Sequence, residues 1–76
     1  MDSPSIFAAR LSRIVTQREL QVLELAYDAL GDKEIARCLG VSRRTVRAHW
    51  EKIFRKMKVN NRLAAVRIWR EVRDMR

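Results

Sequence analysis

The sequence contains little of what small proteins use for turns and cross-links: two glycines, one proline and one cysteine in 76 residues. So few glycines and prolines favour a chain that is almost entirely helical. The single cysteine, Cys38, excludes an internal disulfide, and no cysteines and histidines stand at the spacing of a zinc site. We interpret Cys38 as a small reduced hydrophobe, with a redox-sensing thiol as the alternative, and we expect no metal and no cofactor.

The sequence also lacks segments that would send it into or across a membrane. No apolar run is long enough to span a bilayer, and the N-terminus has no basic start followed by a hydrophobic stretch. We therefore expect a protein that stays in the cytoplasm.

Catalytic groups are equally scarce. There is no glycine-rich phosphate loop, no nucleophile with a placed base and no pair of carboxylates in a recognisable cleft. The only histidine, His49, has no Asp, Cys or second His at ligand spacing, and we interpret it as structural. We expect a protein that is not an enzyme.

Acidic residues are in the minority, with nine against seventeen basic residues, and the formal net charge is +8. Such a charge implies an acidic partner, either a nucleic acid or an anionic membrane. Seven basic residues and one acidic residue lie between positions 42 and 58. The apolar face of that stretch is needed for a core, so it is not free to enter a membrane. We expect a nucleic acid as the partner, with no membrane and no small-molecule ligand.

The stretch from Asp32 to Lys58 predicts two helices joined by a tight turn. Asp32 is predicted to cap a helix over about 32–39, and Gly40 to end it in the left-handed conformation. Ser42 is predicted to cap a second helix over about 43–57, with an apolar stripe opposite a basic face. The stripe consists of Val46, Trp50, Ile53 and Met57. This pattern is typical of a helix-turn-helix.

One more helix is predicted before this motif, and a short extension before that. Thr16 and Glu19 form a capping box, which starts a helix that runs to Leu30 and stops at Gly31. Residues 1–15 are predicted to form an N-terminal extension with an amphipathic helix over about 4–13. That helix covers the core of its own chain, binds a second subunit or is a linker from a larger protein, and the sequence does not decide among these.

A last helix is predicted over about 62–75, capped by Asn60 or Asn61. Its apolar residues cover an arc of about 200°, roughly twice what one buried face needs. The surplus predicts a protein contact, with a helix that is simply more buried than usual as the alternative. The residues predicted to form a dimer interface are Ala64, Ile68, Val72 and Met75.

Together the motifs TQRELQVLELA, KEIARCLGVSRRTVRAHWEKIFRKMKV and NRLAAV resemble the LuxR/GerE-type (NarL-like) DNA-binding domain over about residues 14–67. No single motif is specific, but their combination at this spacing is. The resemblance implies an all-α four-helix bundle over residues 16–76. In that family the third helix enters the major groove of double-stranded DNA and the fourth forms a homodimer. The resemblance also implies a bacterial, nucleoid-associated transcription regulator. In that family the domain also occurs as a small stand-alone protein.

Family position and helical phase together predict the DNA contacts. The predicted base contacts are Arg47, Ala48 and Glu51. Glu51 either accepts a hydrogen bond from cytosine N4 or orients Arg47 or Arg55, and the alternative is an ion pair on a solvated face. The predicted phosphate contacts are Thr16, Lys33, Ser42, Arg43, Arg44, Thr45, Lys52, Arg55 and Lys56. Trp50 and Trp69 are interpreted as core anchors rather than stacking platforms for bases.

Two other functions stay open at this point. A promoter-reading module like region 4 of a sigma factor shares part of the pattern, but such modules usually end soon after the recognition helix. An interaction factor would instead sequester a related regulator through its terminal helices, with DNA contact secondary.

Overall fold

The computed structural model describes Leu11 and residues 13–74, and within this part of the chain it contains helices and no strands. The prediction of an all-α fold is therefore confirmed. The predicted helix over 4–13 lies almost wholly outside the described residues, as does Met75. The helices are α2 (Gln17–Tyr27), α3 (Asp32–Leu39), α4 (Arg43–Met57) and α5 (Arg62–Asp74).

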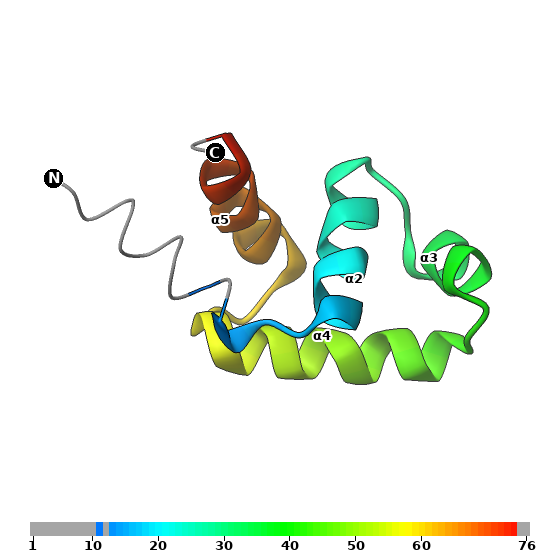
Figure 1. Cartoon of the computed structure of the whole chain (residues 1–76). Coiled ribbons are helices and arrows are strands. Elements are labelled where there is room, and N and C mark those ends of the chain that lie inside the picture. Colours follow the sequence, from blue (N-terminus) through cyan, green and yellow to red (C-terminus); the bar gives the residue numbers. More distant parts are fainter. Residues whose placement is uncertain (1–10, 12, 75–76) are drawn as a thin grey trace, which may run out of the picture.

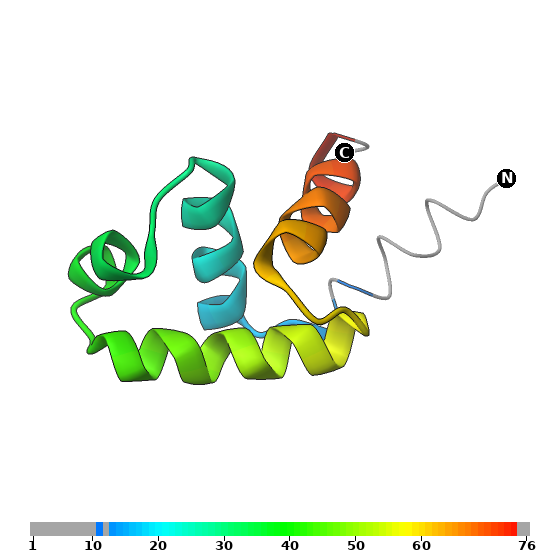
Figure 2. The same ribbon diagram turned by 180° about the vertical axis from the view of Figure 1, so that it is seen from behind.

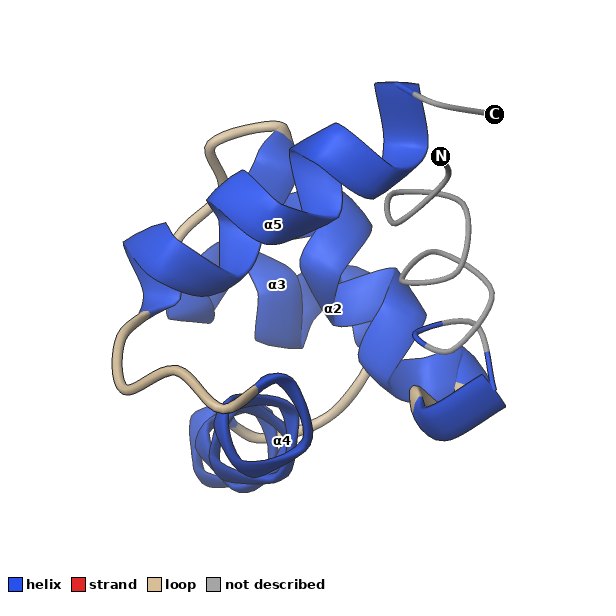
Figure 3. Ribbon diagram, turned by 90° about the vertical axis from the view of Figure 1, so that its left-hand side faces the viewer, coloured by secondary structure: helices blue, strands red, loops and turns tan. Residues whose placement is uncertain are grey.

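Helices α2, α3 and α5 all pack against α4. Figure 1 shows α2 between α3 and α5, with all three on the same side of α4. The view from behind in Figure 2 gives the same arrangement. Viewed close to its axis in Figure 3, α4 has the rest of the bundle on one side only. One long side of α4 is thus left free of the other described helices.

The capping box that was predicted to start α2 is confirmed. The backbone N–H of Glu19 donates to Thr16 Oγ1 at 3.1 Å, and the N–H of Thr16 donates to Glu19 Oε1 at 2.9 Å. The predicted end of this helix is wrong, because α2 stops at Tyr27 rather than at Leu30. The chain turns at Ala29, which takes a positive φ of 69°. Leu30 then lies half-buried beyond the turn instead of extending the helix.

The helix-turn-helix has the predicted bounds but a different first cap. Gly31, not Asp32, is the N-cap of α3, and its N–H donates to Glu34 Oε1 at 3.2 Å. Asp32 is already helical, so its carboxylate is free for contacts with other helices. Gly40 ends α3 at φ 69° as predicted, since glycine has no Cβ to oppose a left-handed conformation.

Both remaining N-caps use side-chain oxygens. Ser42 Oγ accepts from the N–H of Thr45 at 3.1 Å and starts α4 where the sequence predicted. Asn61 Oδ1 accepts from the N–H of Ala64 at 2.8 Å, which decides between the two asparagines proposed for α5. Each such cap contributes about 1 kcal/mol to stability.

The apolar stripe of α4 forms the floor of the core. Val46 and Ile53 are fully buried, and Trp50 and Met57 are nearly so. Trp69 on α5 is 4% exposed, as is Trp50, so the prediction that both tryptophans are core anchors is confirmed. Side chains of this size each contribute about 1.5–3 kcal/mol when fully buried. The other buried apolar residues are Leu11, Val22, Leu23, Ala26, Ile35, Ala36, Ala65 and Val72.

Candidate nucleic-acid interface

The free side of α4 carries the residues that were predicted to read bases. Because the stripe from Val46 to Met57 is buried, residues half a turn away point out of the bundle. The exposed side chains on this free side include Arg44, Arg47, Ala48, Glu51, Lys52, Arg55 and Lys58. The result is a basic convex ridge with one carboxylate in it.

Glu51 lies within the ridge without an ion-pair partner in the described part of the chain. The alternative for this residue was a pair with Arg47 or Arg55 one turn away. No such pair forms among residues 13–74, so the Glu51 carboxylate and the Arg47 guanidinium both remain available to a ligand.

The start of α4 presents polar groups next to the ridge. Ser42 and Arg43 are exposed, and Thr45 is half-buried with its Oγ1 3.0 Å from Ser42 Oγ. Lys33 is exposed in the first turn of α3, and Thr16 is exposed at the N-cap of α2. These predicted phosphate contacts are all accessible, and all five lie at the cap or in the first turn of a helix, where backbone N–H groups favour anions.

Lys56 forms an ion pair with Glu19, contrary to its predicted role as a phosphate contact. Its Nζ lies 2.8 Å from Oε1 and 3.1 Å from Oε2 of Glu19, and the Glu19 side chain is only 2% exposed. A lysine that neutralises a buried carboxylate is not free to neutralise a phosphate. No sequence pattern indicated this pair, because the capping box already accounted for Glu19.

The pKa of Glu19 shows how the site compensates for that burial. Burial raises the pKa, but hydrogen bonds from Lys56 and from the Thr16 backbone, together with the charge of Lys56, lower it more. The net result is a pKa below the ordinary value of 4.5, so the carboxylate is ionised at neutral pH.

His49 is half-buried on the flank of α4 near α2. Burial lowers its pKa, as do the charges of Lys52 and Arg18, while Glu19 opposes them. The imidazole is therefore neutral at pH 7 and adds no charge to the basic ridge. A neutral, half-buried ring agrees with the structural role predicted for His49.

The predicted dimer surface on α5 is only partly available. Val72 is 4% exposed and belongs to the core of its own chain, which corrects its assignment to a subunit interface. Ala64 and Ile68 are half-buried, so part of each side chain is accessible. Leu63, which the sequence did not single out, is the most exposed large hydrophobe of the described residues, at 71%.

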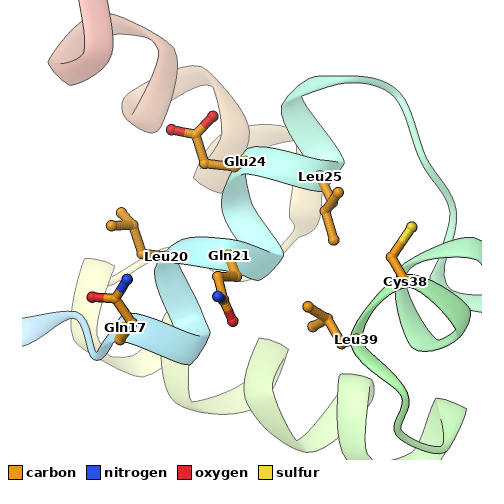
Figure 4. Close-up of a pocket in the computed structure, with 7 residues that line it drawn as sticks. All are labelled: Gln17, Leu20, Gln21, Glu24, Leu25, Cys38 and Leu39. Carbon is orange, nitrogen blue, oxygen red and sulfur yellow. The ribbon is translucent and has the colours of Figure 1, made fainter.

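A shallow hollow of about 390 Å³ lies over the outer face of α2 and the end of α3 (Figure 4). Leu20, Leu25 and Leu39 supply its apolar surface, and Cys38 stands at its edge. Cys38 is exposed, not half-buried as a small hydrophobe would be. None of the DNA-contact residues predicted from the sequence lines this hollow.

Among the described residues, no group of three or more His, Cys, Asp or Glu side chains could hold a metal ion. None of the described helices is both long and apolar enough to cross a membrane.

The region that forms this helix-turn-helix is similar in sequence to known proteins. The family described as bacterial regulatory proteins, luxR family, matches residues 13–69, which include all of α2, α3 and α4. The chain belongs to the luxR family. Its helix-turn-helix is accordingly a DNA-binding unit of bacterial transcription regulation.

Several luxR-family relatives are similar over the same region. The chain is 40% identical over 52 residues to the nitrate/nitrite response regulator protein NarP of Escherichia coli (strain K12), covering 68% of this chain and 24% of that protein. It is 42% identical over 53 residues to the transcriptional regulatory protein DegU of Brevibacillus brevis, and the match covers 70% of this chain and 22% of that protein. The glycerol metabolism activator of Pseudomonas putida is 38% identical over 60 residues, and the match covers 79% of this chain and 27% of that protein.

This luxR-family chain thus spans about a quarter of the length of these relatives. No solved structure gives a significant match to it.

Proposed function

We propose that this chain reads a specific sequence of double-stranded DNA by placing α4 in the major groove, and that it does so as a homodimer. The observation that carries the proposal is the free side of α4, where Arg47, Ala48 and Glu51 are exposed and no other described helix covers them. A helix with its side chains is about 10–12 Å across, which matches a major groove about 12 Å wide.

Each of these side chains has a chemical role in base reading. The Arg47 guanidinium donates two hydrogen bonds to O6 and N7 of a guanine. Ala48 packs against the methyl group of a thymine, and the unpaired carboxylate of Glu51 accepts a hydrogen bond from N4 of a cytosine. A carboxylate facing DNA is repelled by phosphates, so its position among arginines favours a specific base contact.

Phosphate contacts would orient the helix in the groove. The accessible residues for this role flank α4 on both sides and at its start, and Lys56 is left out because it neutralises Glu19. The remaining set is Thr16, Lys33, Ser42, Arg43, Arg44, Thr45, Lys52 and Arg55. Such contacts give affinity and strong dependence on salt without reading sequence.

Ala64 and Ile68 on α5 are the part of the predicted interface that supports a homodimer. Both are apolar and only half-buried within one chain, so a second copy would remove their remaining surface from water. A two-fold dimer binds half-sites about one helical turn apart, so the operator would be a pseudo-palindrome.

The test is selection of bound duplexes from a random pool, followed by sequencing, at near-physiological salt. Wild type is compared with Arg47→Ala, and Arg70→Ala on α5 serves as the control because it removes the same exposed charge away from α4. We expect a two-fold motif whose G·C preference weakens in Arg47→Ala by about 1–3 kcal/mol and stays intact in Arg70→Ala.

Two outcomes would contradict the proposal. A flat, steeply salt-dependent profile that ignores Arg47 would leave only electrostatic binding to DNA. Regulation that survives Arg47→Ala but is lost when Ala64 is replaced would identify an interaction factor that acts through α5.

A further inference from the structure

Three side chains from three helices meet at the carboxylate of Asp32, at the start of α3. Trp50 Nε1 on α4, the recognition helix of the proposed function, donates a hydrogen bond to Asp32 Oδ1 at 3.1 Å. The guanidinium of Arg62, the first residue of α5, forms an ion pair with the same oxygen. Arg62 also lies over the Trp50 ring, 4.8 Å from its centroid. The tryptophan is thus held at its edge by an acid and on its face by a cation.

This cluster restrains α4 in a way that the apolar core does not. Contacts of Val46 and Ile53 are non-directional, so they permit small rotations of the helix about its axis. A hydrogen bond from the buried Trp50 ring weakens steeply when its angle changes. Because Trp50 lies between Arg47 and Glu51 in the sequence, any rotation of Trp50 about the helix axis turns both of these side chains as well.

We propose that Asp32 is a positioning residue for base reading, which fixes the rotation of the recognition helix through Trp50 while Arg62 holds the carboxylate in place. The inference rests on the proposed function, because it concerns how well Arg47 and Glu51 are aimed at the bases. Binding groups must be held within about 10–20° of their productive direction, and supporting contacts of this kind provide that.

Removing the charge of Asp32 has opposite expected effects if Asp32 positions Trp50 and if it acts on DNA only through its charge. Removing the negative charge of Asp32 from a DNA-binding protein should strengthen its binding to any DNA. If Asp32 positions Trp50, the same change weakens the preference for the specific site. Asp32→Ala and Asp32→Asn remove the same charge, but only Asn retains an oxygen that accepts from Trp50 Nε1.

The experiment measures the affinity of each variant for its selected operator and for a scrambled duplex at one salt concentration. We expect Asp32→Ala to lower the ratio of specific to non-specific affinity about tenfold, and Asp32→Asn to restore most of it. Arg62→Gln should lower the ratio as well. For Arg62→Gln, the slope of log affinity against log salt concentration should stay at the wild-type value, whereas the loss of a phosphate contact would reduce that slope by about 0.9.

Arg73 provides a matched control. It also lies on α5, pairs with a carboxylate (Glu24 Oε1, 3.4 Å) and stacks over an aromatic ring (Tyr27, 4.5 Å). Its partners are on α2 rather than on the recognition helix, and its exposure of 41% is close to the 37% of Arg62. Arg73→Gln should therefore leave the discrimination ratio unchanged.

The results distinguish failure of this inference from failure of the proposed function. If wild type discriminates but a folded Asp32→Ala keeps the wild-type ratio, the positioning role is wrong. If Asp32→Ala is not folded by circular dichroism, Trp50→Phe removes the donor N–H together with the five-membered ring of the indole while keeping an aromatic ring in the core, and an unchanged ratio in that variant overturns the role instead. If wild type itself does not discriminate, the proposed function is wrong, and the inference falls with it.

Discussion

Lys56 on α4 lies 2.8 Å from the carboxylate of Glu19 on α2, and it neutralises the one buried charged side chain among the described residues. Glu19 also completes the capping box with Thr16, so a single carboxylate both starts α2 and joins it to α4. Removing either partner therefore affects how α2 and α4 are held together.

Replacing Lys56 by Met should cost about 3 kcal/mol of unfolding free energy, because it leaves the Glu19 carboxylate buried without a countercharge. Urea titration measures the loss. Lys52→Met is the control, since it removes an exposed lysine one turn away and should change stability by less than about 0.5 kcal/mol. Adding Glu19→Gln to Lys56→Met should recover part of the loss, and no recovery would contradict the pairing.

The lowered pKa of Glu19 predicts a loss of stability in acid. The pKa in the folded state lies below the ordinary value of 4.5, so the unfolded chain binds more protons in this range. The contribution of Glu19 is thus complete above pH 4.5 and is lost as the pH falls through the folded pKa. Thermal unfolding at a series of pH values should show a shallower acid decline for Glu19→Gln. Identical declines would show that Glu19 is not shifted.

Lys52 should contribute one phosphate contact to DNA binding. Lys52→Gln is expected to weaken binding to the specific and to the scrambled duplex alike. It should also reduce the slope of log affinity against log salt by about 0.9. Arg70→Gln on α5 should leave the slope as it is. Fluorescence anisotropy over a range of salt concentrations measures both, and an equal change in the two variants would mean that net charge alone decides binding.

Val72 and Ala64 should separate folding from self-association. Val72→Ala removes buried methyl groups and should cost about 2 kcal/mol of stability, with little effect on a dimer interface. Ala64→Glu places a charge on the accessible side of α5 but suits the first helical turn, where acids are favourable. It should abolish dimers in sedimentation experiments without loss of helix. A stable dimer of Ala64→Glu would move the interface elsewhere.

Ala29→Gly should stabilise the protein. Ala29 holds a positive φ of 69° after α2, a conformation that costs residues with a Cβ about 1–2 kcal/mol. Glycine removes that strain, although its greater freedom in the unfolded chain offsets part of the gain. Gly40→Ala, at φ 69° after α3, should have the opposite effect. A lower melting temperature for Ala29→Gly would show that the turn is not strained.

Helix α4 could be predicted almost completely, because its determinants lie close together in the chain. The cap at Ser42, the left-handed stop at Gly40 and the period of the stripe through Trp50 all act within a few residues. The exposed positions of Arg47 and Glu51 then follow from the helical period once the stripe is buried.

The errors come from contacts between residues far apart in the chain. Leu30 continued the apolar pattern of α2, yet the turn at Ala29 redirects the chain so that α3 packs on α4. The side chain of Asp32 is suited to cap a helix, which is why the sequence predicted that role. Its carboxylate instead accepts from Trp50 and Arg62, because the fold brings these distant residues next to it.

The sequence by itself determined the class of fold, the bounds of α3 and α4 and the face of α4 that the other described helices leave uncovered, because these depend on spacing within one helix. Only the tertiary structure decided that Val72 belongs to the core and that Lys56 neutralises Glu19, 37 residues away. A buried apolar residue needs a packing partner and a buried charge needs a countercharge, but the helical period does not say which element supplies either one. That choice is made by packing, when the helices bring distant side chains to within hydrogen-bond distance.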